Sequence, residues 1–133
     1  MRRAAAALAL VLLAGCGSAS PDLFEVRRSG EDPAANVTLV VNDGGHVTCN
    51  GEEHPLDAER LLRARELSRE LAEPAELGIE LPPGPGAVLS YRVRMEAGTI
   101  RFSDTSRGKP PAFLRLAGFT QDVTERVCGI VRQ

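Results

Sequence analysis

The sequence predicts an α+β domain, in which an antiparallel sheet of β-hairpins carries two helices on one face. Three observations predict it: hairpin-like segments with alternating apolar and polar residues, two amphipathic helical segments, and two cysteines far apart in the chain. Half-buried hairpins and amphipathic helices need one another to bury their apolar sides. The predicted order is β-ββ-α-ββ-α, joined by one disulfide.

The first sixteen residues have the pattern of a bacterial lipoprotein signal. Arg2 and Arg3 give a positive start, and residues 4–14 are uncharged and apolar. Such a segment is too short to cross a bilayer, which takes about 20 residues. The four letters LAGC that end at Cys16 resemble a lipobox, where a peptidase cuts before a cysteine that carries diacylglycerol. We therefore expect removal of residues 1–15; the alternative is a buried helix with a chance cysteine.

Lipidation of Cys16 predicts a protein anchored at the extracytoplasmic face of the cell membrane, because several acyl chains hold a protein stably. The segment GSASPD that ends at Asp22 is polar and short, as in a tether. The predicted organisation is therefore a signal peptide (1–15), a lipidated N-terminus with its tether (16–22) and a single domain (23–133).

Cys49 and Cys128 remain once Cys16 is assigned to lipid. Outside the cytoplasm such a pair of thiols is usually joined. We expect a Cys49–Cys128 disulfide, which closes a loop of about 80 residues and stabilises the fold by about 4 kcal/mol. A metal site is the alternative, because His46 and His54 lie close to Cys49. Their spacing matches no familiar zinc pattern, so we expect no metal and no cofactor, and two solvated turn histidines.

The first half of the domain is predicted to contain three strands. A strand at residues 23–28 is followed by a loop at 31–35. Residues 36–41 are rich in β-branched side chains, residues 42–45 read Asn-Asp-Gly-Gly, and residues 46–50 return as the partner strand. Asn-Asp-Gly-Gly between apolar runs is a strong hairpin signal.

Two amphipathic helices are predicted. The first is capped by Asp57 and stopped by Pro74. The second begins at Pro110 and Pro111, where a missing N–H costs nothing. The first helix has an apolar stripe at Leu61, Ala64, Ser68 and Leu71, with Leu67 beside it, and the second has one at Phe113, Leu116, Thr120, Val123 and Val127. The first helix also has a charged side, which we interpret as a solvated face rather than a partner surface because its signs are mixed: Arg60, Arg63, Arg65, Glu66, Arg69 and Glu70.

The clearest hairpin lies between the helices, at residues 89–103, after a Pro- and Gly-rich connector at 82–86. Its apolar residues alternate with Arg92, Arg94 and Arg101, so one face is apolar and the other basic. An exposed face kept soluble by arginine is the simpler interpretation. A surface for an acidic partner is the alternative, and the sequence leaves the choice open.

Two resemblances rest on short segments of this sequence. Five segments resemble a group of small actinobacterial lipoproteins that have no assigned activity: FEVRRSG (24–30), CNG (49–51), SYRVR (90–94), GTIRFSD (98–104) and PPAFL (110–114). The order of an R-S-G strand end, a central helix, a Pro-rich loop, a Y-x-V strand, Asp104 and a terminal helix is similar to emfourin-type inhibitors of thermolysin-like metalloproteases. Glu31 departs from that pattern, in which a second glycine is usual, and no inhibitory residue is carried over.

The sequence shows no arrangement typical of an enzyme or a nucleic-acid-binding protein. Loss of Arg2 and Arg3 with the signal leaves a formal charge of −4, and the chain has no Trp and a single tyrosine, Tyr91. Neither histidine has a nucleophile motif beside it. We therefore expect a membrane-anchored, non-catalytic binding domain with a possible envelope protein as partner. The alternatives are a cell-envelope protease inhibitor of emfourin-like type and, behind it, a metal-binding or enzymatic lipoprotein. A binding module should have an apolar patch or a concave groove beside residues 82–86, and an inhibitor should present a rigid protruding loop.

Overall fold

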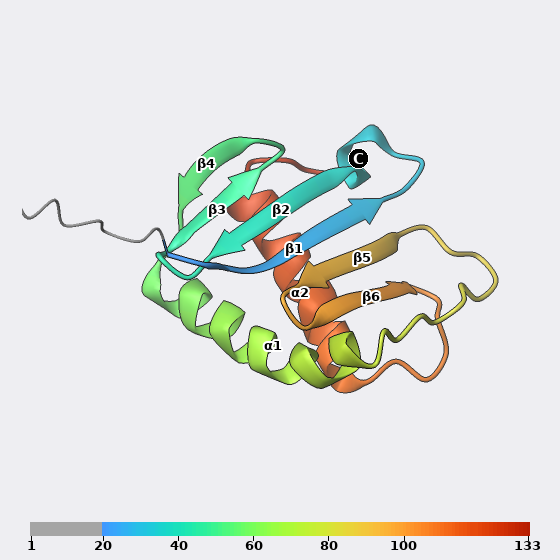
Figure 1. Ribbon diagram of the computed structural model, residues 1–133. Coiled ribbons are helices and arrows are strands. Elements are labelled where there is room, and N and C mark those ends of the chain that lie inside the picture. Colours follow the sequence, from blue (N-terminus) through green and yellow to red (C-terminus); the bar gives the residue numbers. More distant parts are fainter. Residues whose placement is uncertain (1–19) are drawn as a thin grey trace, which may run out of the picture.

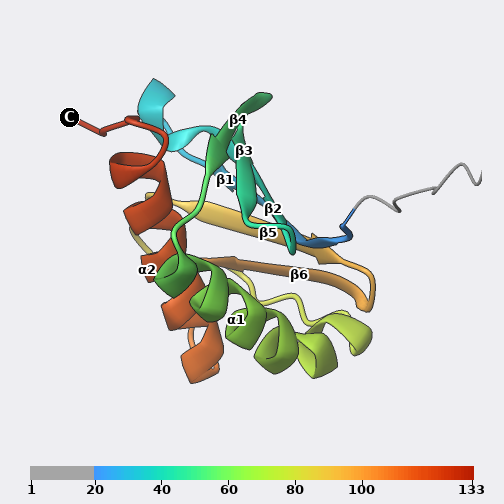
Figure 2. The ribbon, with the colours of Figure 1, turned by 90° about the vertical axis from the view of Figure 1, so that its left-hand side faces the viewer.

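The computed structural model describes residues 20–133, so the predicted signal peptide and Cys16 lie outside the described residues. A six-stranded antiparallel sheet has the order β4-β3-β2-β1-β5-β6. Two helices pack on one face of this sheet (Figures 1 and 2). The elements are β1 (Asp22–Ser29), β2 (Val37–Asn42), β3 (His46–Cys49), β4 (Glu52–Pro55), α1 (Ala58–Glu76), β5 (Ser90–Met95), β6 (Gly98–Ser103) and α2 (Pro111–Arg126). The predicted α+β class is confirmed.

The structure adds two elements to the predicted order. Residues 52–55 form β4, which pairs with β3, whereas the sequence predicts a turn there before the first helix. A 3-10 turn (Pro33–Ala35) lies inside the predicted loop and is capped by Asp32, whose carboxylate accepts a bond of 2.9 Å from the Ala34 N–H. Neither segment has an apolar alternation, so its structure depends on neighbouring backbone rather than on side-chain pattern.

The core lies between the helices and the inner face of the sheet. Successive side chains of a strand point to opposite faces of the sheet, so every second residue reaches the core. Phe24 and Val26 of β1 are two of these buried residues. Phe113 of α2 stacks on Phe102 of β6, with ring centroids 4.9 Å apart. The largest fully buried side chains are Phe24, Phe113, Leu39, Leu71, Ile100, Leu116, Val26, Val41, Val47, Val93, Val123 and Thr120.

Helix α1 departs from its prediction at its end. The helix begins after the predicted cap, where the Asp57 carboxylate accepts a bond from the Arg60 N–H, but it runs through Pro74 to Glu76. Proline lacks an N–H and so removes one backbone hydrogen bond of the helix. In the last turn few further hydrogen bonds follow that could be lost with it. The buried stripe of α1 is Ala64, Leu67, Leu71 and Ala75, which lies slightly round the helix from the predicted one.

The predicted disulfide is present. Cys49 ends β3, Cys128 follows α2, and their Cα atoms lie 5.9 Å apart across a sequence separation of 79 residues. The bond therefore ties the end of the last helix to the sheet.

Candidate functional site

The sheet face opposite the helices carries a row of arginines. Arg27, Arg92 and Arg101 are direct partners in register across β1, β5 and β6. Neighbouring strands lie about 4.8 Å apart, so the three side chains stand next to one another on one surface. Like charges placed directly opposite one another destabilise a sheet. This row therefore lowers the stability of the sheet, whereas a solvated face with alternating charges would not.

A row of serines lies beside the arginines. Ser29, Ser90 and Ser103 are also direct partners in register, two residues further along the same strands. Both rows line a pocket of about 430 Å³, whose other lining residues include Leu81 and Pro83. The pocket thus combines guanidinium and hydroxyl groups with a small apolar wall.

The connector at residues 81–84 forms that wall and is fixed to the body of the protein. Its backbone extends the sheet, because the Leu81 N–H donates to the Arg101 carbonyl over 2.8 Å. The Thr105 hydroxyl donates to the Gly84 carbonyl over 2.9 Å. A Cβ on Gly84 would lie 2.4 Å from the Thr105 carbonyl oxygen, so only glycine allows this approach. The wall is therefore held in place before any ligand arrives.

The charges on this face are not balanced. Glu25 pairs with both Arg27, at 2.9 Å, and Arg94, at 3.0 Å. Arg101 pairs with Glu80 at 3.3 Å. Within residues 20–133 no carboxylate pairs with Arg92, and its Nε is buried without a hydrogen-bond partner. Four arginines therefore share two glutamates, and the guanidinium at the centre of the row has an unmet donor.

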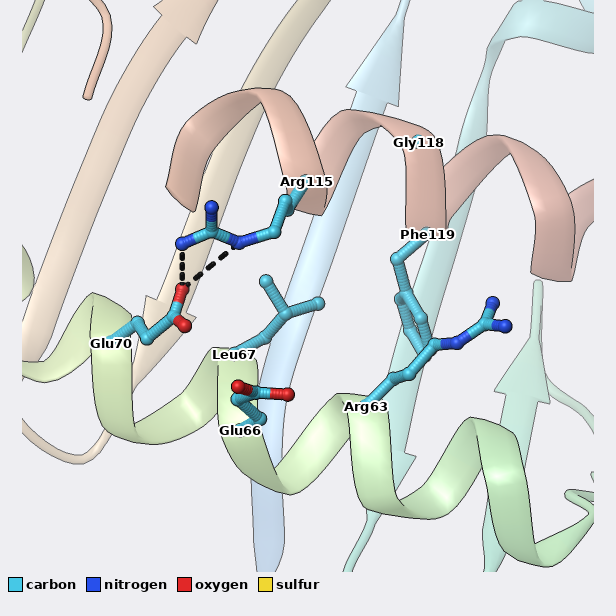
Figure 3. A pocket seen from close by; sticks show the side chains of 7 residues that line it. All are labelled: Arg63, Glu66, Leu67, Glu70, Arg115, Gly118 and Phe119. Atoms are coloured by element: carbon cyan, nitrogen blue, oxygen red, sulfur yellow. Dashed lines mark hydrogen bonds and ion pairs between the residues drawn. The ribbon is translucent and has the colours of Figure 1, made fainter. Parts of the chain in front are cut away.

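A second pocket, of about 270 Å³, lies between α1 and α2 (Figure 3). Leu67 and Phe119 point into the space between the helices, and the Glu70 carboxylate pairs with the Arg115 guanidinium across it. Gly118 leaves the hollow, since a Cβ there would meet nothing within 4 Å. The Glu70 and Arg115 charges satisfy each other, and the groove has no row of like charges such as the arginine face carries.

Three of the four arginines of α1, Arg60, Arg63 and Arg65, are held by carboxylates. Arg60 donates to both Asp122 carboxylate oxygens, at 2.8 and 3.2 Å, and so joins α1 to α2. This bond lowers the pKa of Asp122 and raises that of Arg60. Arg65 donates to the Asp43 carboxylate over 2.6 Å. These pairs support the interpretation of the charged side of α1 as a solvated face whose charges hold neighbouring elements together.

His46 and His54 lie on strands β3 and β4 and not in turns, which corrects their predicted setting. His46 lies 3.9 Å from Glu53, and His54 lies 3.6 Å from Glu52. Cys49 is bonded to Cys128 and is not a free thiol. Among residues 20–133 no group of three or more His, Cys, Asp or Glu side chains is placed to hold a metal ion.

The structure brings Arg92 and Arg101 together as the hairpin predicts, and it places Arg94 on the same face but outside the pocket. Sequence reasoning missed Arg27, because its position in the row depends on the pairing of β1 with β5.

Sequence reasoning also missed the role of Arg28, which points to the inner face and is 3% exposed. Arg28 donates to the Ala35 and Ala34 carbonyls, at 2.9 and 3.2 Å, and burial lowers its pKa. This side chain fixes the turn that follows β1. The alternation of β1, which puts Arg28 on the side of Phe24 and Val26, is the signal that could have found it.

Comparison with known protein families, with curated proteins and with solved structures finds no match. Within residues 20–133 no helix is both long enough and apolar enough to pass through a membrane. The chemistry of the site therefore has to be argued from its own side chains. Guanidinium forks and hydroxyl groups bind anionic oxygens, and nothing among the lining residues supplies a general base or a nucleophile with its base. The pocket is suited to binding an anionic group.

Proposed function

We propose that this chain is a lipid-anchored, non-catalytic binding domain of the cell envelope, which engages an anionic partner through the pocket of the arginine face. The observation that carries the proposal is the row of Arg27, Arg92 and Arg101 in register, with the donor of Arg92 unmet within the described residues. Placement outside the cytoplasm is supported by the Cys49–Cys128 disulfide, because such bonds persist in oxidising compartments. It is also supported by the signal-like segment that ends at Cys16.

The geometry of the first described residues suggests how an anchored domain would be oriented. The Ser20 carbonyl accepts a bond of 2.7 Å from the Asn42 side chain, and the Pro21 carbonyl accepts one of 2.9 Å from the Asp43 N–H. Part of the predicted tether therefore already belongs to the domain. Three residues lie between Cys16 and Ser20, and the four steps from one to the other span at most about 14 Å.

An anchor at Cys16 would thus hold the β2–β3 turn close to the membrane. The serine row lies at the other end of the strands, where β1 ends and β5 begins (Figure 1). A strand of this length spans roughly 25 Å. In this arrangement the pocket lies toward the end of the sheet that is away from the anchor, which favours a partner from the envelope space over the lipid surface that carries the anchor.

Replacement of Cys16 with serine is expected to abolish lipid labelling and to leave the uncut precursor in cells, because serine lacks the thiol that accepts the lipid. Metabolic labelling with a radioactive fatty acid, followed by intact mass measurement, checks both. Cys128→Ser is the matched control: it also removes one thiol, and its labelling should match that of the unmodified chain. Labelled Cys16→Ser protein would contradict the proposed anchor.

Inhibition of an envelope metalloprotease is a second candidate function, favoured by the connector beside the pocket. Pro82, Pro83 and Pro85 are exposed on a segment that Thr105 fixes to the body, which gives a stiff loop on the surface. An inhibitor is expected to lower the activity of a thermolysin-like protease at stoichiometric amounts. A panel of such enzymes that keeps full activity with excess protein would remove this candidate.

A further inference from the structure

We infer that the pocket binds a terminal phosphate monoester, with Arg27, Arg92 and Arg101 as its charged donors. This inference rests on the proposed function, because it names the ligand chemistry of the same pocket. The pocket has the volume of a site for a small molecule or for the end of a larger one, about 430 Å³.

The number of donors favours phosphate over carboxylate. A carboxylate has two oxygens and one charge, so a single guanidinium fork satisfies it. Three arginines line the pocket, one from each strand of the row. Two of them also face a glutamate, Arg27 with Glu25 and Arg101 with Glu80, whereas the buried Nε of Arg92 has no partner within residues 20–133. A phosphate monoester has three terminal oxygens and a charge of about −1.5 to −2. It can therefore accept from arginines on neighbouring strands, which are spaced about 4.8 Å apart, and offset the repulsion between them.

The serine row adds neutral donors on the same side of the site. Ser29 and Ser90 are exposed beside the arginine row, and hydroxyl groups donate readily to phosphate oxygens. The Ser103 hydroxyl is within 3.2 Å of both Thr105 and Ser106, so it belongs to the support of the wall. Arg92 lies in the centre with its Nε buried and without a partner in the described chain. An anion in the pocket would give that donor an acceptor.

The wall supports a bound group without having to close on it. The Ser106 hydroxyl donates to the Leu81 carbonyl over 3.3 Å and accepts a bond of 2.9 Å from the Ser103 N–H. Pro82 and Pro83 reduce the freedom of the same segment. A site that is already ordered loses little entropy when a ligand binds. The small apolar surface of Leu81 and Pro83 suits the carbon atoms next to a phosphate ester.

The test is a titration of the complete processed chain in non-ionic detergent, followed by NMR and calorimetry. The probes are glycerol 3-phosphate for a monoester, dimethyl phosphate for a diester, and succinate for a dianion that has only carboxylates. Glycerol 3-phosphate is expected to bind more tightly than both other probes and to shift the Ser90 and Arg92 amide signals. Equal or tighter binding of succinate or dimethyl phosphate would overturn the inference, and so would the absence of glycerol 3-phosphate binding.

The matched variants are Arg92→Gln and Arg94→Gln, which change the same charge on the same strand and face. Arg94 lies outside the pocket and its side chain is 59% exposed. Arg92→Gln is expected to weaken glycerol 3-phosphate binding by at least about tenfold, and Arg94→Gln by no more than about twofold. Equal losses would mean a general effect of charge and would overturn the inference.

Two further readouts separate binding from a structural role. Arg92→Gln should unfold at the same or a higher denaturant concentration, because it removes a like charge from the row. A clear loss of stability would assign Arg92 a structural role and overturn the inference. If no phosphate probe binds but a cross-linker at Ser90 still captures an envelope component, the phosphate inference is wrong and the proposed binding function is kept.

Discussion

Removal of the Cys49–Cys128 disulfide by a double change to alanine is expected to lower the free energy of unfolding by about 4 kcal/mol. The bond joins residues 79 apart in sequence, so the open chain gains much conformational freedom when it unfolds. The chain-entropy account of disulfides gives this value for a loop of such length. Urea unfolding of the processed chain, followed by circular dichroism in non-ionic detergent, measures the difference.

The matched comparison is the unmodified chain under a reductant. It should lose the same stability as the double variant, because both open the same loop. Alanine at Cys49 also leaves a slightly smaller side chain in a site that is 4% exposed. A loss below about 1 kcal/mol in both samples would show that the loop is constrained by other contacts in the unfolded chain.

Gly98→Ala is expected to destabilise the fold by at least about 3 kcal/mol, from a steric overlap together with backbone strain. Gly98 opens β6 with φ of 151°, a conformation that residues with a side chain rarely adopt. A Cβ there would lie 2.0 Å from the Ala75 carbonyl oxygen of α1. Neither backbone segment can yield, because the hairpin is in register with β1 and Ala75 is buried.

Gly118→Ala is the control for this change. It makes the same substitution inside α2, where a Cβ would meet nothing within 4 Å. Alanine is favoured over glycine in a helix, so stability should rise by about 0.5–1 kcal/mol. Denaturant unfolding of the two variants side by side checks the pair. Similar stability of both would show that the β5–β6 turn moves away from α1 without cost.

Much of the fold could be predicted because its signals are local. The turn at residues 42–45 and the alternation in residues 89–103 each define a hairpin from adjacent residues. The cap at Asp57 and the stripe that contains Phe113 define the helices in the same way. The end of α1 could not be read correctly, because burial of Ala75 outweighs the local effect of Pro74.

The candidate site could be predicted only in part, because half of it depends on contacts between distant segments. Arg92 and Arg101 belong to one hairpin, and their common face follows from the strand period. Arg27 joins them only because β1 pairs with β5 across more than 60 residues. No local signal specifies that pairing. The prolines and glycines of residues 82–86 identify a connector, and a pocket lies beside it, but the attachment of this connector through Thr105 is a tertiary contact.

Some charged groups of the molecule hold its elements together, and others do not. Charged pairs such as Arg60 with Asp122 join the helices, and the disulfide joins α2 to the sheet. The arginine face is built differently, since it places like charges in register and leaves the donor of Arg92 unmet within residues 20–133. Because this arrangement costs stability, we propose that its charges act on something outside the domain.

The most direct measurement places a photo-reactive amino acid at Ser90, inside the pocket, and at Thr48, on the same sheet face but outside it. After irradiation of living cells, the protein is isolated and its adducts are identified by mass spectrometry. The account predicts a discrete adduct with an envelope component from Ser90 that is absent from Thr48 and is lost when Arg92 is changed to glutamine. Identical adducts from both positions, or none from Ser90, would contradict a binding function for the arginine face.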